Sequence, residues 1–194
     1  MLLGPFHKDK IEAGVDEAGR GPLAGGVWAA AVIFAPDYEN AEINDSKKLS
    51  ERTRERLRTV IERDAVAWAI GICSVEEVDR LNILQASIEA MHRAIAKLRV
   101  KPEAIIVDGN RFNPYGETPY RTIVGGDAKY LSIAAASILA KTYRDKEMLR
   151  LDREFPMYGW AKNKGYPTIE HRRAIRRYGI SPYHRKSFRL TDRE

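Results

Sequence analysis

The sequence has very little cysteine and no long apolar run, and both shortages limit what the protein can be. Cys73 is the only cysteine among 194 residues, which excludes an internal disulfide and a zinc site built on several thiolates. It lies in the apolar run "WAIGICS", which indicates a core residue, and a lone thiol fits a reducing cytoplasm. The longest apolar run, residues 27–35, is far shorter than the ~20 residues that span a membrane. The first ten residues lack the apolar core of a signal peptide, so we expect a soluble, cytoplasmic protein.

The chain also lacks internal repeats, low-complexity tracts and any linker rich in glycine, serine and proline. Nothing in the composition divides it, and we expect one domain over residues 1–194. A chain of this length buries roughly 70% of its unfolded surface, which supplies a sizeable core without disulfides.

Charge is distributed unevenly along the chain. Residues 151–194 hold 11 Lys/Arg against 5 Asp/Glu, whereas the first 150 residues hold 22 of each. A neutral body with a basic C-terminal segment favours a polyanionic partner, most plausibly nucleic acid. The alternative is a solvated helix face that only aids solubility, and charge alone does not decide between them.

The hydrophobic pattern predicts an α/β protein. Apolar stretches at residues 14–19, 25–35 and 65–74 predict three strands, the first two joined by a Gly/Pro loop that favours an antiparallel hairpin. Residues 104–108 and 121–124 predict two further strands. Helical patterns cover residues 49–65, 74–98, 129–155 and 168–179, with Ser50 and Ser74 at N-cap positions. We expect a mixed β-sheet flanked by helices, with a helical, basic C-terminal part from about residue 155 to 194.

Four acidic residues stand where a predicted strand gives way to a loop or helix: Asp16, Glu17, Asp108 and Asp127. Carboxylates at strand ends of an α/β sheet can converge in one crevice although they are far apart in sequence. Gathered carboxylates cannot all stay ionised without compensation, and the usual compensation is a hard divalent cation, Mg²⁺ or Mn²⁺. Two such ions ~3.5–4 Å apart would suit phosphodiester cleavage.

Each of these carboxylates also has a purely structural explanation. A strand-end aspartate is often a turn former or a helix cap, and Asp127 stands where an N-cap would. Asp45, in the loop "DSKKLS", fits a turn better than a ligand set. Glu17 follows Asp16 directly, and neighbours on a regular strand point to opposite faces, so it joins the others only if the strand ends or bends there.

The segment "GVDEAGRGPLAGG", residues 14–26, places a glycine loop directly after two carboxylates. A dinucleotide-binding loop is excluded, because the glycine spacing is wrong, Pro22 stands where a helix should open, and the carboxylates would face the pyrophosphate. Bound metal would reverse the local charge and let the loop lie against a nucleic-acid backbone.

This segment resembles the signature of the type 2 ribonucleases H, the ribonuclease HII family. The resemblance continues in order through "DSKKLS", "IIVDGN", "GGDAKYLSIAAASILAKTYRD", "NKGYPTIEH" and "SPYHRKSF", from about residue 13 to 188. It implies a ribonuclease H-like fold and a metal-dependent endonuclease. Such an enzyme would cut the RNA strand of RNA/DNA hybrids and nick DNA duplexes 5′ of an embedded ribonucleotide, leaving 3′-hydroxyl and 5′-phosphate ends.

The resemblance also implies residue roles. The catalytic, metal-holding carboxylates would be Asp16, Glu17, Asp108 and Asp127. Substrate would be bound by Gly19, Arg20 and Gly21, which would read the 2′-hydroxyl through main-chain groups, by Tyr166 on the ribose, and by Lys47 near a phosphate. These residue types suit those tasks, because the 2′-hydroxyl distinguishes RNA from DNA and glycine permits close backbone approach.

Other polar residues are expected to support the site rather than to perform the chemistry. Ser137, Lys141 and Asp145 share one helix face at spacings of four. His171 and His184 stand among arginines, where a phosphate contact or solvation is expected. We also expect a monomer with no clamp-binding motif in its tail. The competing functions are a DNA junction nuclease of the same fold and a non-catalytic nucleic-acid-binding module.

Overall fold

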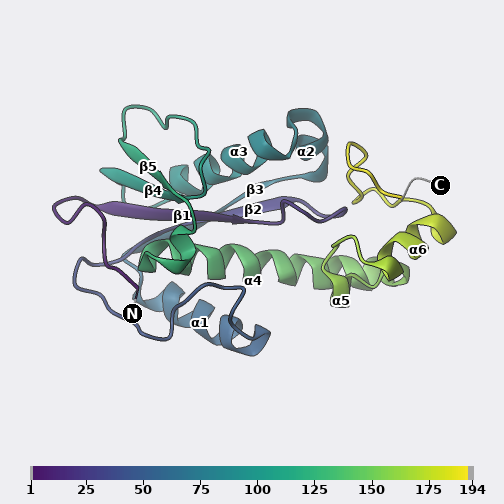
Figure 1. Ribbon diagram of the computed structural model, residues 1–194, viewed down its shortest axis with the longest axis horizontal. Coiled ribbons are helices and arrows are strands. Elements are labelled where there is room, and N and C mark those ends of the chain that lie inside the picture. The colour runs from purple at the N-terminus through teal and green to yellow at the C-terminus, as the bar shows by residue number, and fades with distance from the viewer. Residues whose placement is uncertain (1, 192–194) are drawn as a thin grey trace.

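The computed structural model describes residues 2–191 and is built around a five-stranded mixed sheet. The strands are β1 (Glu12–Ala18), β2 (Val27–Ile33), β3 (Ala67–Cys73), β4 (Ala104–Asp108) and β5 (Tyr120–Ile123), in the order β3-β2-β1-β4-β5. The first three form an antiparallel meander, as the short Gly/Pro loop predicted. β4 and β5 continue the sheet parallel to β1, so all three end at the same edge (Figure 1).

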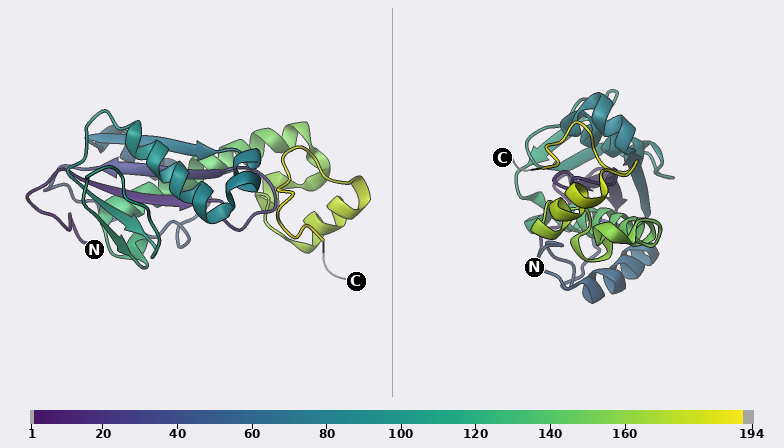
Figure 2. Two further views of the ribbon diagram at one scale, coloured as in Figure 1. Left: turned by 90° about the horizontal axis from the view of Figure 1, so that it is seen from above. Right: turned by 90° about the vertical axis from the view of Figure 1, so that its right-hand side faces the viewer.

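Helices cover both faces of this sheet (Figures 1 and 2). On one face lie α1 (Glu51–Asp64) and the long α4 (Leu131–Glu154), which pack against β2 through an alanine-rich cluster. On the other lie α2 (Val75–Leu81) and α3 (Ile83–Ala96), whose apolar residues pack on β1 to β4. The mixed sheet flanked by helices is therefore confirmed.

Helix α4 lies unusually close to β1 because Gly14 has no side chain. A Cβ at Gly14 would collide with the backbone of Ser132 in the first turn of α4. The alanines of α4, among them Ala134, Ala135 and Ala136, are fully buried and add to this close approach. An alanine-rich face is typical of a helix that packs this closely on a sheet.

The predicted helix over residues 74–98 is broken into two. The capping box at Ser74 and Glu77 is present, but α2 ends after Leu81 and Asn82 adopts a φ of 67°. The Asn82 side chain accepts hydrogen bonds from the backbone N–H groups of Leu84 and Gln85, which makes it the N-cap of α3. Asparagine is one of the few residues that tolerates a left-handed φ and caps a helix.

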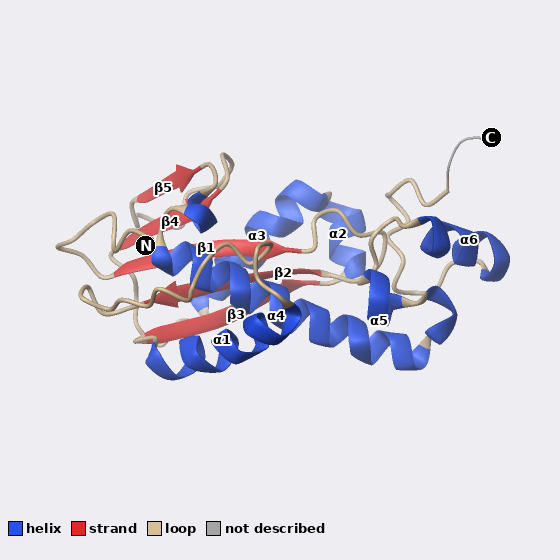
Figure 3. Cartoon of the chain, turned by 60° about the horizontal axis from the view of Figure 1, so that its bottom comes forward, coloured by secondary structure: helices blue, strands red, loops and turns tan. Residues whose placement is uncertain are grey.

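The C-terminal part contains a 3₁₀ turn η2 (Pro156–Tyr158), a short helix α5 (Trp160–Asn163) and the basic helix α6 (Ile169–Tyr178), grouped at the far end of α4 (Figure 3). Its small core includes Tyr158, Trp160 and Ile175. Thr168 caps α6 at its start, and the helix ends at Gly179, as the pattern over residues 168–179 predicted. No helix in residues 2–191 is long and apolar enough to cross a membrane.

The expectation that His171 and His184 contact phosphate or solvent is wrong, because both are fully buried. Trp160 Nε1 donates to His171 Nε2 at 3.0 Å, and His171 Nδ1 lies 2.9 Å from the carbonyl of Tyr166. His184 Nδ1 accepts from the N–H of Ser181 at 2.9 Å, which leaves its Nε2–H to face His171 Nε2 at 3.2 Å. This arrangement satisfies two neutral rings and has no place for a second proton on either.

We expect these two histidines to destabilise the folded protein below neutral pH for this reason. Burial lowers the pKa of His171, and burial together with His171 lowers the pKa of His184 to about 4. In the unfolded chain a histidine binds its proton near pH ~6.5, so acidification across this window favours unfolding by up to about 1.4 kcal/mol per pH unit for each histidine. The carboxyl groups whose pKa is raised act in the opposite direction, so the wild type is compared with a His184→Asn variant that shares them. Denaturant unfolding at about pH 7.5, 6.5 and 5 should show the free energy falling more steeply in the wild type, and equal slopes would contradict the prediction.

Candidate active site

The four predicted carboxylates lie at one edge of the sheet. Asp16 and Glu17 are near the end of β1, Asp108 is the last residue of β4, and Asp127 lies in the 3₁₀ turn η1 (Gly126–Ala128) that follows β5. Because β1, β4 and β5 are parallel neighbours, their ends bring these residues together from three separate parts of the chain.

Asp16 is the most deeply buried of the pair on β1, at 5% exposure. Its Oδ1 accepts the N–H of Glu17 at 2.7 Å, and Ser137 of α4 hydrogen-bonds to its side chain. Burial, and then the charges of Glu17 and Asp108, raise the pKa of Asp16 well above its ordinary value. The Asp16 carboxylate is therefore held in place at an electrostatic cost.

Glu17 lies next to the last residue of β1, which ends at Ala18, so the strand ends here as one of the two predicted conditions required. The pairing of β1 with β2 continues regularly through Glu17 and Ala18. Burial and the charge of Asp108 still raise the pKa of Glu17, against the opposing effect of Arg20, whose Nη1 lies 3.3 Å from Glu17 Oε1. These effects on the pKa values show that Glu17 is close enough to Asp16 and Asp108 to interact with them at the end of β1.

Asp108 and Asp127 are linked through the turn between them. Asp108 Oδ1 accepts the N–H of Gly126 at 2.7 Å. Burial and the charge of Asp127 raise the pKa of Asp108, although the Gly126 and Asp127 N–H groups oppose this. Asp127 is not the N-cap of α4: that position is Tyr130, which makes no side-chain cap. The alternative explanation of Asp127 as a helix cap is therefore wrong.

Lys47 reaches the carboxylates from the loop before α1. Its Nζ lies 3.1 Å from Asp127 Oδ2, and this ion pair, with Asp45 and Asp16, outweighs partial burial and raises the pKa of Lys47. Asp45 accepts the N–H of Lys47 at 2.9 Å, which is the turn role the sequence predicted. The next residue back, Ser46, is buried and bonds Ser137 Oγ at 2.9 Å. Ser137 thus connects the lysine loop to Asp16.

The donor set suits a hard divalent cation. It consists of carboxylate oxygens. Burial, and then the charges of neighbouring carboxylates, raise the pKa of Asp16, Glu17 and Asp108, and a bound cation would offset both effects. In residues 2–191, no three acidic, histidine or cysteine side chains already converge tightly enough to enclose an ion. The carboxylates are neighbours around the sheet edge rather than a closed ligand cage.

The glycine loop lies beside the carboxylates. Gly19 has a φ of +98°, and a Cβ there would collide with the side chain of Arg144, so no other residue fits. Gly21 is exposed, and a Cβ on it would lie 3.6 Å from the ring of Tyr166. Tyr166 itself is 42% exposed, with the Arg144 guanidinium 6.0 Å from its ring centre. Gly21 and the Tyr166 ring therefore form one continuous surface.

The polar face of α4 that carries Ser137, Lys141 and Asp145 is largely buried and supports the site. Lys141 Nζ bonds Asp145 Oδ1 at 2.7 Å, as the spacing predicted, and Asp145 is only 4% exposed. Burial lowers the pKa of Lys141 despite this partner. Of the three stripe residues, Ser137 is the one that contacts a predicted catalytic carboxylate.

Sequence reasoning missed the part that the N-terminal segment plays. Glu12 is almost fully buried and accepts the N–H groups of Phe6 at 2.9 Å and His7 at 2.8 Å. Leu3 then accepts the N–H of Leu131 at 2.9 Å, which satisfies a free donor at the uncapped start of α4, just after Asp127. A glutamate at the first residue of a strand does not by itself indicate, in the sequence, that it binds the N-terminal segment.

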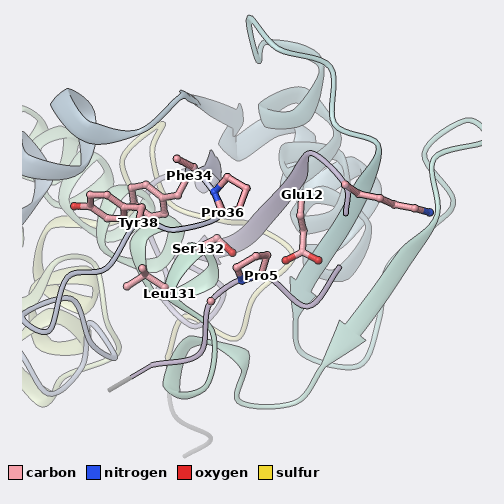
Figure 4. A pocket seen from close by; sticks show the side chains of 10 residues that line it. Pro5, Glu12, Phe34, Pro36, Tyr38, Leu131 and Ser132 are labelled. Atoms are coloured by element: carbon pink, nitrogen blue, oxygen red, sulfur yellow. The ribbon is translucent and has the colours of Figure 1, made fainter. Parts of the chain in front are cut away.

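The pocket in Figure 4 is separate from this site. It lies around Pro5, Glu12, Pro36 and Leu131, at the opposite end of β1 from Asp16, and contains none of the four carboxylates. Its one acidic side chain, Glu12, is already occupied by the N-terminal segment.

Comparison with known proteins finds similarity over nearly the whole chain. The family model described as Ribonuclease HII matches residues 13–191. The Ribonuclease HII of Parabacteroides distasonis is 62% identical over 190 residues, covering 98% of this chain and 96% of that protein. A structure of RNase HII from Archaeoglobus fulgidus, solved in complex with PCNA, superposes with a TM-score of 0.78 at 28% identity and covers 95% and 98% of the two chains.

A more distant structure, Bst-RNase HIII in complex with Mn²⁺, has a TM-score of 0.66 at 20% identity over 87% of this chain and 62% of that one, and shows the fold alone. The fold is thus ribonuclease H-like, as the motifs implied, and the similarity in sequence extends over nearly the whole chain. The chain belongs to the ribonuclease HII family of endoribonucleases.

Proposed function

We propose that the protein cuts the RNA strand of RNA/DNA hybrids and nicks DNA duplexes on the 5′ side of an embedded ribonucleotide, leaving 3′-hydroxyl and 5′-phosphate ends. The observation that carries the proposal is the gathering of Asp16, Glu17, Asp108 and Asp127 at one sheet edge, beside the Gly19–Gly21 loop and Tyr166. Such an activity would start the removal of ribonucleotides from DNA.

The four carboxylates would hold two divalent ions, Mg²⁺ or Mn²⁺. Bound there, the ions would activate water and stabilise the leaving oxygen. The chain's own residues prepare this site: Ser137 orients Asp16, the Gly126 N–H orients Asp108, and Lys47 balances the charge of Asp127. Lys47, with its side chain 78% exposed, would turn from Asp127 to a substrate phosphate when cations arrive.

Ribose recognition would fall to the glycine loop and the tyrosine. In residues 2–191 the N–H groups of Arg20 and Gly21 donate to no protein acceptor, and both residues are exposed. They are free to donate to a 2′-hydroxyl oxygen, while the Tyr166 ring offers a flat apolar face to the sugar. A DNA junction nuclease would have no use for this pair.

We further propose that the chain works as one catalytic domain, as a monomer, in the cytoplasm. The C-terminal part supports the first point, because Arg185 and Tyr183 hydrogen-bond directly to the loop between β1 and β2. The tail in which we predict no clamp-binding motif includes residues 192–194, which lie outside the described residues. The PCNA complex is a property of the Archaeoglobus protein.

The first test uses a DNA duplex with one embedded ribonucleotide and an otherwise identical all-DNA duplex, each with Mg²⁺, Mn²⁺ or chelator. We expect one metal-dependent nick 5′ of the ribonucleotide and none in the control, because only the first duplex carries a 2′-hydroxyl. Equal cutting of both duplexes would indicate a junction or general nuclease. Binding without cutting would indicate a nucleic-acid-binding module.

Asp108→Asn separates catalysis from stability. We expect nicking to fall by at least about 10²-fold, beyond the ~10–100-fold typical of groups that only orient a metal ligand. With chelator present the melting temperature should equal or exceed that of the wild type, because a neutral amide relieves the repulsion that raises the pKa of Asp108 and still accepts the Gly126 N–H. Activity within a few-fold of wild type would refute the role of Asp108.

Glu42→Gln is the matched control for that experiment. Glu42 is exposed and its carboxylate pairs with Arg56 at 2.7 Å, on the α1 side of the molecule. Removing its charge should leave nicking unchanged and should not raise the melting temperature, because Arg56 lowers the pKa of Glu42.

A further inference from the structure

A single buried arginine donates hydrogen bonds to several carbonyls of the glycine loop. Arg185, from the C-terminal segment that follows α6, is fully buried. Its guanidinium donates to four main-chain carbonyls of the loop between β1 and β2: Nε to Gly25 at 2.9 Å, Nη1 to Arg20 at 3.0 Å, and Nη2 to Gly19 at 2.6 Å and Gly26 at 3.2 Å. Arg185 and the loop that it binds are about 160 residues apart in sequence.

This arginine has no acidic partner. In residues 2–191 no carboxylate oxygen forms an ion pair with Arg185, and it stands near a second buried guanidinium, that of Arg144. Burial and then Arg144 lower the pKa of Arg185 to about 9, which still leaves it charged at neutral pH. An unpaired buried charge is costly unless hydrogen bonds satisfy it, and here four of the five guanidinium N–H groups are used on carbonyls.

These hydrogen bonds fix the orientation of the peptide groups in the loop. The carbonyls of Gly19 and Arg20 point inward to Arg185, and the N–H groups of Arg20 and Gly21 remain at the surface without a protein acceptor. Without the cation, two adjacent peptide groups beside a flexible glycine could turn over and present oxygens instead. An oxygen-lined surface would not suit the electron-rich face of a phosphodiester backbone.

Main-chain bonds hold Arg185 and the loop in register. The N–H of Arg185 donates to Leu23 O at 2.9 Å, and the N–H of Gly25 donates to Tyr183 O at 2.9 Å. On its other side the segment is held by Asp79 of α2, which accepts the N–H groups of Lys186 and Ser187 at 3.0 Å each. In Figure 1 this segment, in yellow, lies beside the loop that joins β1 to β2.

Arg144 extends the same arrangement to Tyr166. It donates to Ala24 O at 3.1 Å and to Lys164 O at 3.0 Å, so it joins the glycine loop to the segment that carries the tyrosine. Its Nε has no hydrogen-bond partner and packs against Gly19. The Arg144 guanidinium therefore joins the loop to the segment of the tyrosine, and the N–H of Leu23 adds a main-chain bond to the carbonyl of Gly165 at 2.8 Å.

We infer that Arg185 is a positioning residue that sets the preference for a ribonucleotide: by holding the loop carbonyls inward it presents the Arg20 and Gly21 N–H groups to the 2′-hydroxyl. This inference rests on the proposed function, because it assigns the reader of the same substrate. It adds a residue that touches no substrate and acts only through the loop.

The test measures the affinity of wild type and Arg185→Lys for the single-ribonucleotide duplex and the all-DNA duplex, with Ca²⁺ in place of the catalytic metal. Lysine keeps the charge but has three donors on one atom and cannot hold four carbonyls. We expect the variant to lose about tenfold of the ribonucleotide preference, the equivalent of one hydrogen bond, while its affinity for all-DNA duplex stays unchanged. A merely structural defect would lower both affinities together.

Two further variants keep the result decisive. Asp79→Asn removes part of the support for the Arg185 segment from a half-buried position and should lose a smaller share of the preference. Arg93→Lys is the matched control, because Arg93 donates to Ile72 O at 2.7 Å and pairs with Glu77 away from the loop; it should keep the full preference.

A folded Arg185→Lys with the wild-type ratio of affinities would overturn the inference. If that variant does not fold, an unchanged ratio in Asp79→Asn would overturn it. A wild type that shows no ribonucleotide preference would instead refute the proposed function, so the two failures are distinguishable.

Discussion

The contact of α4 with β1 at Gly14 is the constraint on which the rest of the structure depends. It allows the helix to run directly beneath the strand, and successive turns of α4 then meet successive parts of the site. Ser137 reaches Asp16, and further along Arg144 packs under Gly19. One helix thereby sets the relative positions of a predicted catalytic carboxylate and the loop beside it.

The site contains a cluster of carboxylates and, under the glycine loop, a pair of guanidinium groups. Each cluster of like charges is stabilised by different partners. The carboxylates repel one another and are balanced by Lys47, Arg20 and main-chain N–H groups. The guanidinium groups of Arg144 and Arg185 lie under the loop and are balanced by main-chain carbonyls. Backbone dipoles therefore stabilise both signs of charge, which keeps the carboxylates free of arginine partners from the core and open to cations.

Both ends of the chain brace this region although neither contributes a carboxylate. Leu3 satisfies the N–H of Leu131 just after Asp127, and Glu12 holds the segment in place. At the other end of the chain, Arg185 holds the glycine loop by donating hydrogen bonds to its carbonyls. Membership of the ribonuclease HII family follows from the whole chain, and these braces show why residues far from the signature segment matter to it.

The sequence by itself determined whatever depends on neighbours a few residues apart. The strand and helix patterns, the caps at Ser50 and Ser74 and the end of α6 at Gly179 were all predictable, because each signal and its partner lie within one turn. The placement of acidic residues at strand ends was also readable, and parallel pairing brings such ends to one edge. Local patterns did not predict the break at Asn82. This one residue ends α2 and is also the N-cap of α3.

Only the tertiary structure decided which polar residues are buried and what they hold. His171 and His184 look like surface residues among arginines, yet each is the other's neighbour in the core. Arg185 looks like one more basic residue in a basic tail, yet it holds carbonyls about 160 residues away. The physical reason is the same in each case: burial and hydrogen-bond partners at long range depend on how the elements pack, and composition and spacing carry no record of that packing.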